Sequence, residues 1–330
     1  MTISPPVSLA SRSASADLPL AVGPAISQMR RVMDLVLTLV APPNAGGFSI
    51  NLREVFGSVG ARGKESRKIE AGEAAVTDVI LEADDLDAVR EALRGPIADQ
   101  ELDWCLQPVQ GRRKSLLIAD MDSTIINVEC LDELADYAGV KAEISAITER
   151  AMRGELEFEG ALRQRVAMLR GLPLEALQRA YDERVRLNPG ARTLVRTMSA
   201  NGARCVLVSG GFTFFTTKVA EACGFHAQRA NTLEEADGKL TGLVGEPILG
   251  REAKLAALHR YADALAVPLS AALAVGDGAN DLAMIEAAGL GVAYHAKPIV
   301  AARADAKVDH ADLTALLYFQ GYSLGDFVTD

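Results

Sequence analysis

The feature that most constrains this chain is a short apolar run that ends in two aspartates. The run 116–119 has the length of a buried strand, and Asp120 and Asp122 follow it at once. Ligands and catalytic groups collect at the carboxyl ends of strands in open α/β sheets. Two carboxyl groups at this turn can face one cavity, where one stays ionised and the other is protonated. Taken alone, the same residues also fit a turn in which Asp122 or Ser123 caps a helix.

Two later residues, Ser209 and Lys254, could bind the oxygen atoms of a phosphate group, although each also has a common structural explanation. Ser209 ends the apolar run 205–208, and the two glycines after it leave their N–H groups open to an anion. A tight turn is the common reason for such a sequence. Lys254 lies in a predicted helix, where most lysine side chains are solvated. Ser209 and Lys254 become evidence for a phosphate site because they follow Asp120 and Asp122 in this order along the chain.

A second acidic group follows the apolar run 271–275. Asp277 and Asp281 are four residues apart, with glycines around the first, and such carboxylates form the hard oxygen site that Mg²⁺ prefers. Capping of the next helix by Asp277 or Asn280 would also explain the pattern. Like Asp120, Asp277 stands just after a predicted strand.

Strand and helix patterns alternate from residue 189 onward, which indicates an α/β fold with a doubly wound parallel sheet. Residues 128–188 instead show stretches of helical period with no strand pattern between them. We therefore expect a helical-bundle cap at 128–188, inserted into a catalytic core made of residues 109–127 and 189–330. A polar hairpin around Asp237 falls within the second part of this core.

Upstream, residues 31–108 show the element order β-α-β-β-α-β of a ferredoxin-like α+β domain. This order resembles ACT-type amino-acid-sensing modules, and a structural or dimerising role fits equally well. Its strands beginning at Val32 and Val76 would pair with another subunit in a homodimer. We expect the core to fold and work without residues 1–108. Residues 1–30 are rich in Ser, Ala and Pro, which predicts disorder.

The composition of the chain indicates which kinds of molecule the protein is not expected to bind. The formal net charge of −10 argues against a nucleic-acid binder, which would need a basic face. No apolar run reaches the length of a membrane span, so no membrane partner is expected. The four cysteines are scattered without zinc-type spacing, which predicts reduced thiols in a cytoplasmic protein.

The four polar groups, in this order, resemble the motifs of the haloacid dehalogenase-like phosphatases. The first motif corresponds to Asp120-x-Asp122-Ser123-Thr124, and the second and third correspond to Ser209 and Lys254. The fourth corresponds to Gly276-Asp277-x-x-x-Asp281. The resemblance covers about residues 115–320 and implies a Rossmann-type core, in agreement with the strand pattern.

Longer matches narrow the resemblance to the phosphoserine phosphatase family. The segments that carry it are 120–124, Glu129, 158–166, 208–212, 237–242 and 274–281. The resemblance implies an enzyme whose small-molecule substrate is O-phospho-L-serine. It also implies Mg²⁺-dependent hydrolysis through an aspartyl-phosphate, which is the last step of serine biosynthesis.

The resemblance also implies a role for each matched residue. Asp120 would be the nucleophile and Asp122 the general acid and base. The metal ligands would be Asp120, the backbone carbonyl of Asp122 and Asp277, with Asp281 orienting a metal-bound water.

The substrate-binding residues that the resemblance implies divide into two sets. The phosphoryl oxygens would be bound by Ser209, the Gly210 N–H, Lys254 and Asn280. In the cap, Glu129 would bind the substrate ammonium group and Arg165 its carboxylate, while Met152 and Phe158 would form an apolar wall.

Two alternatives remain open on the sequence. One is a related phosphatase or phosphotransferase for another small phosphoester, such as phosphohomoserine, because one scaffold serves many esters. The other is a serine-binding regulatory protein with a vestigial hydrolase core. The matched acidic residues and Lys254 argue against the second alternative.

Overall fold

The computed structural model describes residues 32–43, 49–152, 155–250 and 252–329, and it gives no side-chain placement for Met152. The segment predicted to be disordered, 1–30, lies outside these residues. Within the described residues, no helix has both the length and the apolar character needed to cross a membrane.

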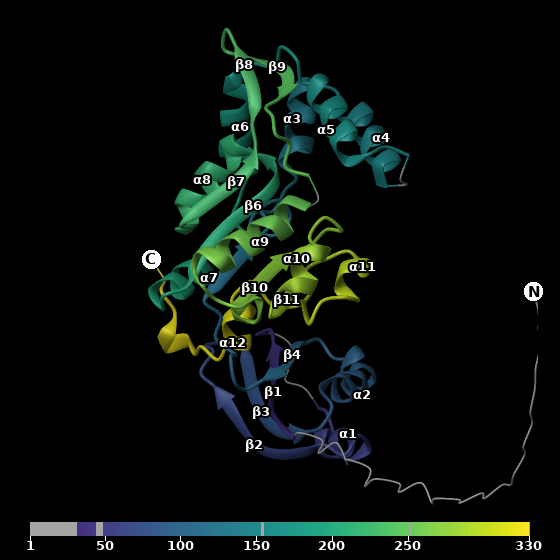
Figure 1. The fold of residues 1–330 in the computed structure, drawn as a ribbon, viewed down its shortest axis with the longest axis vertical. Helices are drawn as coiled ribbons and strands as arrows, with labels where there is room; N and C mark the ends of the chain where they lie inside the picture. The colour runs from purple at the N-terminus through teal and green to yellow at the C-terminus, as the bar shows by residue number, and fades with distance from the viewer. Residues whose placement is uncertain (1–31, 44–48, 153–154, 251, 330) are drawn as a thin grey trace, which may run out of the picture. The chain divides into compact units, whose positions relative to one another are not determined.

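The core is a parallel sheet of six strands in the order β12-β11-β10-β5-β6-β7 (Figure 1). This confirms the predicted α/β fold. The strands are β5 (Leu116–Ala119), β6 (Arg204–Phe212), β7 (Ala227–Asn231), β10 (Ala272–Gly276), β11 (Leu290–Tyr294) and β12 (Ala306–Val308). The helices of the core are α7 (Ala191–Ala200), α8 (Thr213–Cys223), α9 (Glu252–Ala264), α10 (Leu282–Ala287), α11 (Pro298–Ala301) and α12 (Ala315–Phe319).

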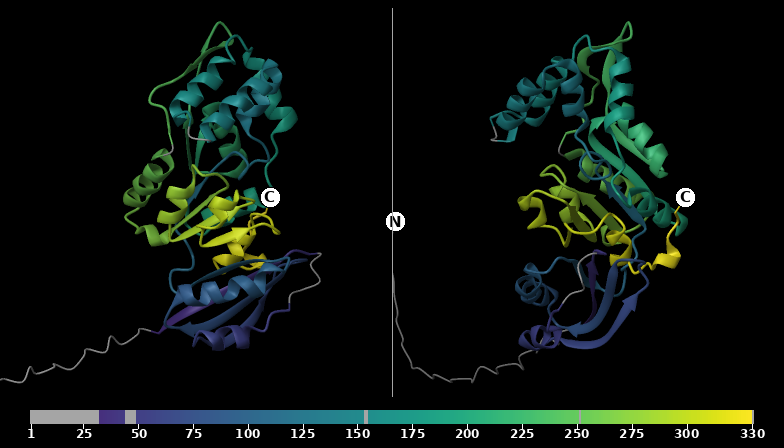
Figure 2. Two further views of the ribbon diagram at one scale, coloured as in Figure 1. Left: turned by 90° about the vertical axis from the view of Figure 1, so that its right-hand side faces the viewer. Right: turned by 180° about the vertical axis from the view of Figure 1, so that it is seen from behind.

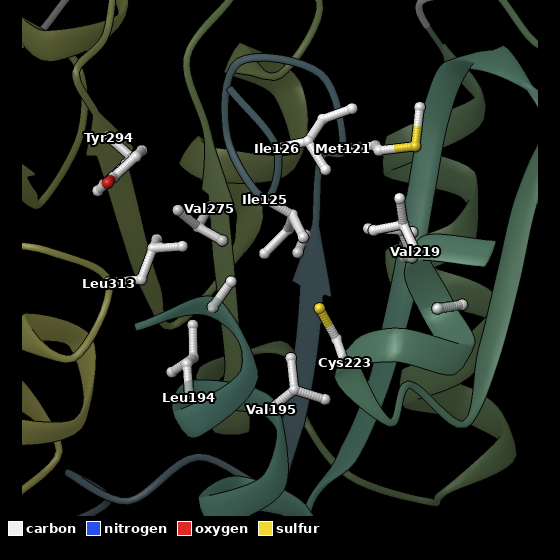
Figure 3. Close-up of a cluster of buried hydrophobic side chains, with 14 of the residues drawn as sticks. Met121, Ile125, Ile126, Leu194, Val195, Val219, Cys223, Val275, Tyr294 and Leu313 are labelled. Atoms are coloured by element: carbon white, nitrogen blue, oxygen red, sulfur yellow. The ribbon is translucent and has the colours of Figure 1, made fainter. Parts of the chain in front are cut away.

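The two faces of this sheet are covered by different helices because side chains alternate along each strand. Leu117 and Ala119 share one buried cluster with residues of α7, α8 and α12. Figure 3 shows Leu194 of α7 and Val219 of α8 in this cluster, around the central strands. Leu116 and Ile118 point to the other cluster, which includes residues of α9, α10 and α11. Burial on both faces explains why these strands read as continuous apolar runs.

The cap consists of α3 (Cys130–Ala138), α4 (Lys141–Met152), α5 (Phe158–Ala167) and α6 (Leu174–Arg184). The hairpin of β8 (Leu233–Ala236) and β9 (Lys239–Val244) joins it, although the predicted boundaries assign this hairpin to the core. Leu240 exchanges backbone hydrogen bonds with the chain after α5: its carbonyl accepts from Gly171 and its N–H donates to Leu172. The hairpin thus pairs with a cap loop far away in sequence, a contact that local patterns do not reveal.

The N-terminal module has the predicted element order and antiparallel strand order β2-β3-β1-β4. Its strands are β1 (Met33–Ala41), β2 (Arg62–Ile69), β3 (Ala75–Ala83) and β4 (Asp103–Pro108). Figure 2 shows α1 (Leu52–Ser58) and α2 (Leu86–Ala98) lying on one face of this sheet. Asp85 begins α2 by accepting the Ala88 N–H, as a helix cap does. The likeness to ACT modules stays a prediction.

The module is joined to the core within one sheet. Trp104 of β4 pairs with Lys307 of β12, so the described strands form a sheet of ten. Asp103 adds a polar link, because its carboxylate accepts backbone N–H groups from 309–311 of the core. The predicted pairing of the Val32 and Val76 strands with another subunit is wrong, since β1 lies between β3 and β4, and β3 lies between β1 and β2. A homodimer formed in another way stays a prediction.

A buried ion pair links the core to the face of the module's sheet that α1 and α2 do not cover. Arg112 donates to both oxygens of Asp78 at 2.7 Å and to the backbone carbonyls of Tyr318 and Phe319. Thr38 donates to the same carboxylate at 2.8 Å. A fragment beginning after residue 108 would leave Arg112 without this carboxylate. We therefore expect such a fragment to be less stable than the full chain. The prediction that the core folds and works without residues 1–108 stays a prediction.

Candidate active site

The site is built at the carboxyl ends of β5 and β10, where Asp120 and Asp281 meet Lys254 of α9. Lys254 Nζ lies 2.7 Å from Asp120 Oδ1 and 2.5 Å from Asp281 Oδ1. All three side chains are buried. The ammonium group therefore bridges two carboxylates that lie far apart in the sequence.

Asp281 is held on its second oxygen as well. Its Oδ2 accepts the backbone N–H groups of Asp277 and Gly278, at 3.2 and 3.0 Å. The turn leaves no room for a side chain at residue 276, where a Cβ atom would lie 2.3 Å from the Asp281 carboxyl carbon. The glycines of this motif therefore permit a tight turn around the Asp281 carboxylate. Such an arrangement suits the orienting role predicted for Asp281.

Three carboxylates at this place could hold a metal ion. Asp120, Asp277 and Asp281 each offer an oxygen, and these oxygens lie within 4.8 Å of one another. Burial, followed by the charge of Asp281, raises the pKa of Asp277 to about 6 and that of Asp120 well above its usual value. Lys254 supplies one positive charge against three negative ones. The donor set therefore fits a divalent cation that prefers oxygen ligands.

Asp122 occupies a different environment from Asp120. Its Oδ1 accepts the backbone N–H of Cys130 at 3.1 Å, and its Oδ2 accepts the Ser209 hydroxyl at 3.2 Å. Burial, followed by the charge of Glu129, raises the pKa of Asp122 to about 7. A carboxyl group with such a pKa can both give and take a proton near neutral pH.

A pocket brings together several groups that the sequence nominated. Among its lining residues are Ser209, Gly210, Lys254 and Asn280, with Phe158 of the cap. The Ser209 Oγ accepts the Gly211 N–H at 2.8 Å, which fixes the hydroxyl at the end of β6. Four predicted substrate-binding groups therefore share one pocket next to Asp120.

Glu129 and Arg165 lie on the cap and are not among the residues that line this pocket. Glu129 precedes α3 and accepts the Ser123 hydroxyl at 2.7 Å. Arg165 lies on α5 and donates to Thr148 Oγ1 and to the carbonyl of Ala161. The pKa of Arg165 is lowered, because the effect of burial outweighs the opposite effect of the charges of Asp132 and Glu129. The two predicted amino-acid ligands thus both belong to the cap and carry opposite charges.

The structure adds two contacts that the sequence interpretation missed. Thr124 Oγ1 donates to Asp277 Oδ1 at 3.3 Å, so it supports one carboxylate of the acidic cluster. Its place in the first motif was a signal for such a role. Cys130 contacts Asp122, and nothing in the sequence distinguishes this cysteine from the other three.

Two family models match the chain. The model described as haloacid dehalogenase-like hydrolase matches residues 117–286, and it contains every site residue named above from Asp120 to Asp281. A second model, for a protein of unknown function (DUF3240), matches residues 14–114. The N-terminal module therefore has relatives of its own.

Individual relatives support the match to the haloacid dehalogenase-like hydrolases. The chain is 48% identical over 207 residues to a phosphoserine phosphatase of Polaromonas sp., covering 61% of this chain and 88% of the relative. A solved hydrolase of the same family from Salmonella enterica serovar Typhi superposes with a TM-score of 0.77 at 29% identity, covering 88% of this chain and 100% of that one. A probable phosphoserine phosphatase from Vibrio cholerae superposes with a TM-score of 0.66 at 33% identity, covering 90% and 88%.

Proposed function

The chain belongs to the haloacid dehalogenase-like hydrolases, and from this premise we propose that it hydrolyses O-phospho-L-serine to L-serine and phosphate. The observation that carries the proposal is the pocket at the end of β6, where Ser209 and Lys254 meet beside Asp120. The similarity to phosphoserine phosphatases supports the choice of substrate. A cytoplasmic location is part of the proposal, supported by four cysteines that are all buried and free.

The reaction divides between the two aspartates of the first motif. A carboxylate oxygen of Asp120 attacks phosphorus, forming the aspartyl-phosphate while the bond from phosphorus to the serine oxygen breaks. Asp122 gives its proton to the departing serine oxygen. It then takes a proton from the water that attacks the aspartyl-phosphate, which releases phosphate and restores Asp120. The raised pKa of Asp122 supports this exchange.

The phosphoryl group would be bound by three donors from two elements. Ser209 and the Gly210 N–H lie at the end of β6, and Lys254 comes from α9. These donors suit the equatorial oxygens, which carry the negative charge of the transition state. Asn280 supplies a further polar group to the pocket. Because Lys254 already contacts Asp120, it also holds the nucleophile near the phosphoryl site.

We propose that Asp120, the backbone carbonyl of Asp122 and Asp277 hold Mg²⁺, while Asp281 orients a bound water. The acidic cluster and its excess of negative charge support this choice. When bound, Mg²⁺ neutralises charge on the phosphoryl oxygens and on the carboxylates that would otherwise repel them.

Removal of divalent cations tests this assignment. Excess chelator should abolish phosphate release, and added Mg²⁺ should restore it. Mg²⁺ should also raise the thermal unfolding temperature of the wild type, because a ligand that binds only the folded state stabilises it. The same shift should be lost in Asp277→Asn. Undiminished turnover in excess chelator would contradict the metal assignment.

We propose that Glu129 and Arg165 bind the amino-acid part of the substrate. Serine carries an ammonium group and a carboxylate, and the cap carries the Glu129 carboxylate and the Arg165 guanidinium group. A guanidinium group can bind a carboxylate through two parallel hydrogen bonds. Selection would therefore come from the cap, whereas phosphate binding and chemistry come from the core.

Replacing these residues should affect phosphoserine far more than an aryl phosphate. Arg165→Ala and Glu129→Gln should each lower kcat/KM for phosphoserine roughly ten- to a hundredfold, because a hydrogen bond to a charged group is worth about 1.5–3 kcal/mol. Phenyl phosphate has neither charged group, so its turnover should change little. The measurement is kcat/KM for both substrates with each variant.

Arg163→Ala is the matched control for these variants. Arg163 lies on the same helix, is half-exposed, and pairs with Glu246 at the surface. Its loss should leave the preference between the two substrates unchanged. Equal losses on both substrates for Arg165→Ala would mean that this residue supports the core and does not read the amino acid.

A panel of phosphate esters tests the substrate directly. O-Phospho-L-serine should release phosphate much faster than phosphohomoserine does when Mg²⁺ is present. Adding homoserine as an acceptor should produce no phosphohomoserine, which would exclude a phosphotransferase. Absence of phosphate release from every ester would favour the regulatory alternative with a vestigial core.

A further inference from the structure

Asn231 is a buried asparagine at the end of β7, and only 1% of it is exposed. Its side-chain amide makes three hydrogen bonds, all to the backbone. Nδ2 donates to the carbonyls of Gly210, at 2.9 Å, and Leu249, at 3.4 Å, while Oδ1 accepts the Leu249 N–H at 2.7 Å. Turning the amide over would set its oxygen against two carbonyl oxygens, so these partners fix its orientation. Asn231 therefore links two backbone segments that are far apart in sequence.

The first of these segments is the turn at the end of β6, which binds phosphate in the proposed function. The carbonyl that Asn231 contacts belongs to the peptide unit between Gly210 and Gly211, and the N–H of the same unit donates to Ser209 Oγ at 2.8 Å. A peptide unit between two glycines turns easily, because no Cβ atom restricts the backbone. Hydrogen bonds on both of its sides therefore fix this unit. Since Ser209 Oγ accepts the Gly211 N–H, its own proton remains available for Asp122 or for a phosphoryl oxygen.

The second segment leads into the helix that carries Lys254. Leu249 and Gly250 line the pocket at the end of β6, shortly before α9 begins. Residues 232–248 form the excursion that contains the hairpin of the cap, and the chain returns to the core at Leu249. The two hydrogen bonds between Leu249 and Asn231 close the base of this excursion. Asn231 therefore sets the place at which the chain enters the pocket wall.

We propose that Asn231 is a positioning residue for phosphate binding, which holds the turn 209–211 against the segment that precedes α9. This inference rests on the proposed function, because it takes the pocket as the phosphate site. Asn231 is not among the residues that line the pocket, and it acts through Gly210 and Leu249, which are. Loss of its amide would leave the phosphate donors present but no longer directed at one phosphoryl group.

Binding of inorganic phosphate tests this role without catalysis. We expect Asn231→Ala to raise the dissociation constant of phosphate about three- to tenfold, the size of one hydrogen bond. A titration followed by phosphorus NMR, with Mg²⁺ present, measures this constant. Asn231→Leu keeps a side chain of similar size that cannot form hydrogen bonds, so it should weaken phosphate binding as much. If Asn231→Leu binds phosphate as the wild type does, this residue only fills space and the inference is overturned.

Gln320→Ala is the matched control for these variants. Gln320 is also 1% exposed, and its amide accepts the Lys114 N–H and donates to the Leu316 carbonyl. Lys114 precedes β5, whereas the site follows the carboxyl end of that strand. Gln320→Ala should therefore lower the thermal unfolding temperature but leave phosphate binding unchanged. An equal loss of phosphate binding in this control would trace the effect to general destabilisation and overturn the inference.

Hydrogen exchange in the wild type examines the contact without any variant. Leu249 lies outside the helices and strands, and its N–H donates to Asn231. This N–H should therefore exchange slowly with water, and rapid exchange would overturn the inference. The phosphate titration also separates this inference from the choice of substrate. A protein whose phosphate binding depends on Asn231 but which does not hydrolyse phosphoserine would refute the proposed substrate and leave the role of Asn231 standing.

Discussion

Asp120→Asn should lower phosphoserine turnover by at least about a thousandfold, because an amide oxygen is a poor nucleophile and the covalent route is lost. The fold should survive. Asp120 is buried, and its Oδ1 accepts hydrogen bonds from the Met121 N–H and from Lys254, which an asparagine oxygen can also do. The change also removes a charge that repels Asp281. Turnover and the urea unfolding midpoint should therefore respond in different ways.

Asp122→Asn is the informative comparison for this variant. It keeps the nucleophile but removes the acid and base, so a phosphorylated enzyme should form from a substrate with a good leaving group and then persist. Mass spectrometry should detect one added phosphoryl group in Asp122→Asn and none in Asp120→Asn. A phosphoryl adduct in Asp120→Asn would place the nucleophile elsewhere.

The core of the site was predictable because its signals are local. The strand before Asp120 is four apolar residues long, and the structure assigns it at 116–119, as the sequence predicted. Burial on both faces of a parallel sheet makes such runs continuous and easy to find. The tight turn around Asp281 likewise leaves a mark in the sequence, since it requires glycine at residue 276.

The connection between module and core was not predictable, because its partners are far apart in sequence. Asp78 follows Thr77 in β3 and looks like a residue of a solvated strand face, yet it is completely buried. Arg112 lies in the polar stretch that joins β4 to β5. Only the fold shows that these two side chains meet. The same limit applies to the hydrogen bond from the Cys130 backbone N–H to Asp122, which follows from the fold and not from any spacing in the sequence.

Asp78→Ala should destabilise the protein by about 3–5 kcal/mol, the usual cost of breaking a buried ion pair by removing one partner. Arg112 would keep its bonds to two carbonyls but lose the carboxylate that neutralises it, with only 11% of its side chain exposed to water. A large fall in the urea unfolding midpoint is expected. Thr38→Val removes the hydrogen bond from Thr38 to the same carboxylate and the one that Arg112 donates to Thr38, and it should cost about 2 kcal/mol.

Asp34→Ala provides the control for this stability prediction. Asp34 pairs with Lys64 at the surface of the same module, with both side chains substantially exposed, so its loss should cost at most about 1 kcal/mol. Because Asp78 joins the module to the core, its loss should also separate their unfolding into two transitions, whereas we expect one transition for the wild type. If Asp78→Ala unfolds in a single transition near the midpoint of Asp34→Ala, then Arg112 is neutralised in some other way. The module would then owe its attachment to apolar contacts, to the pairing of β4 with β12 and to the hydrogen bonds that Asp103 accepts from the core.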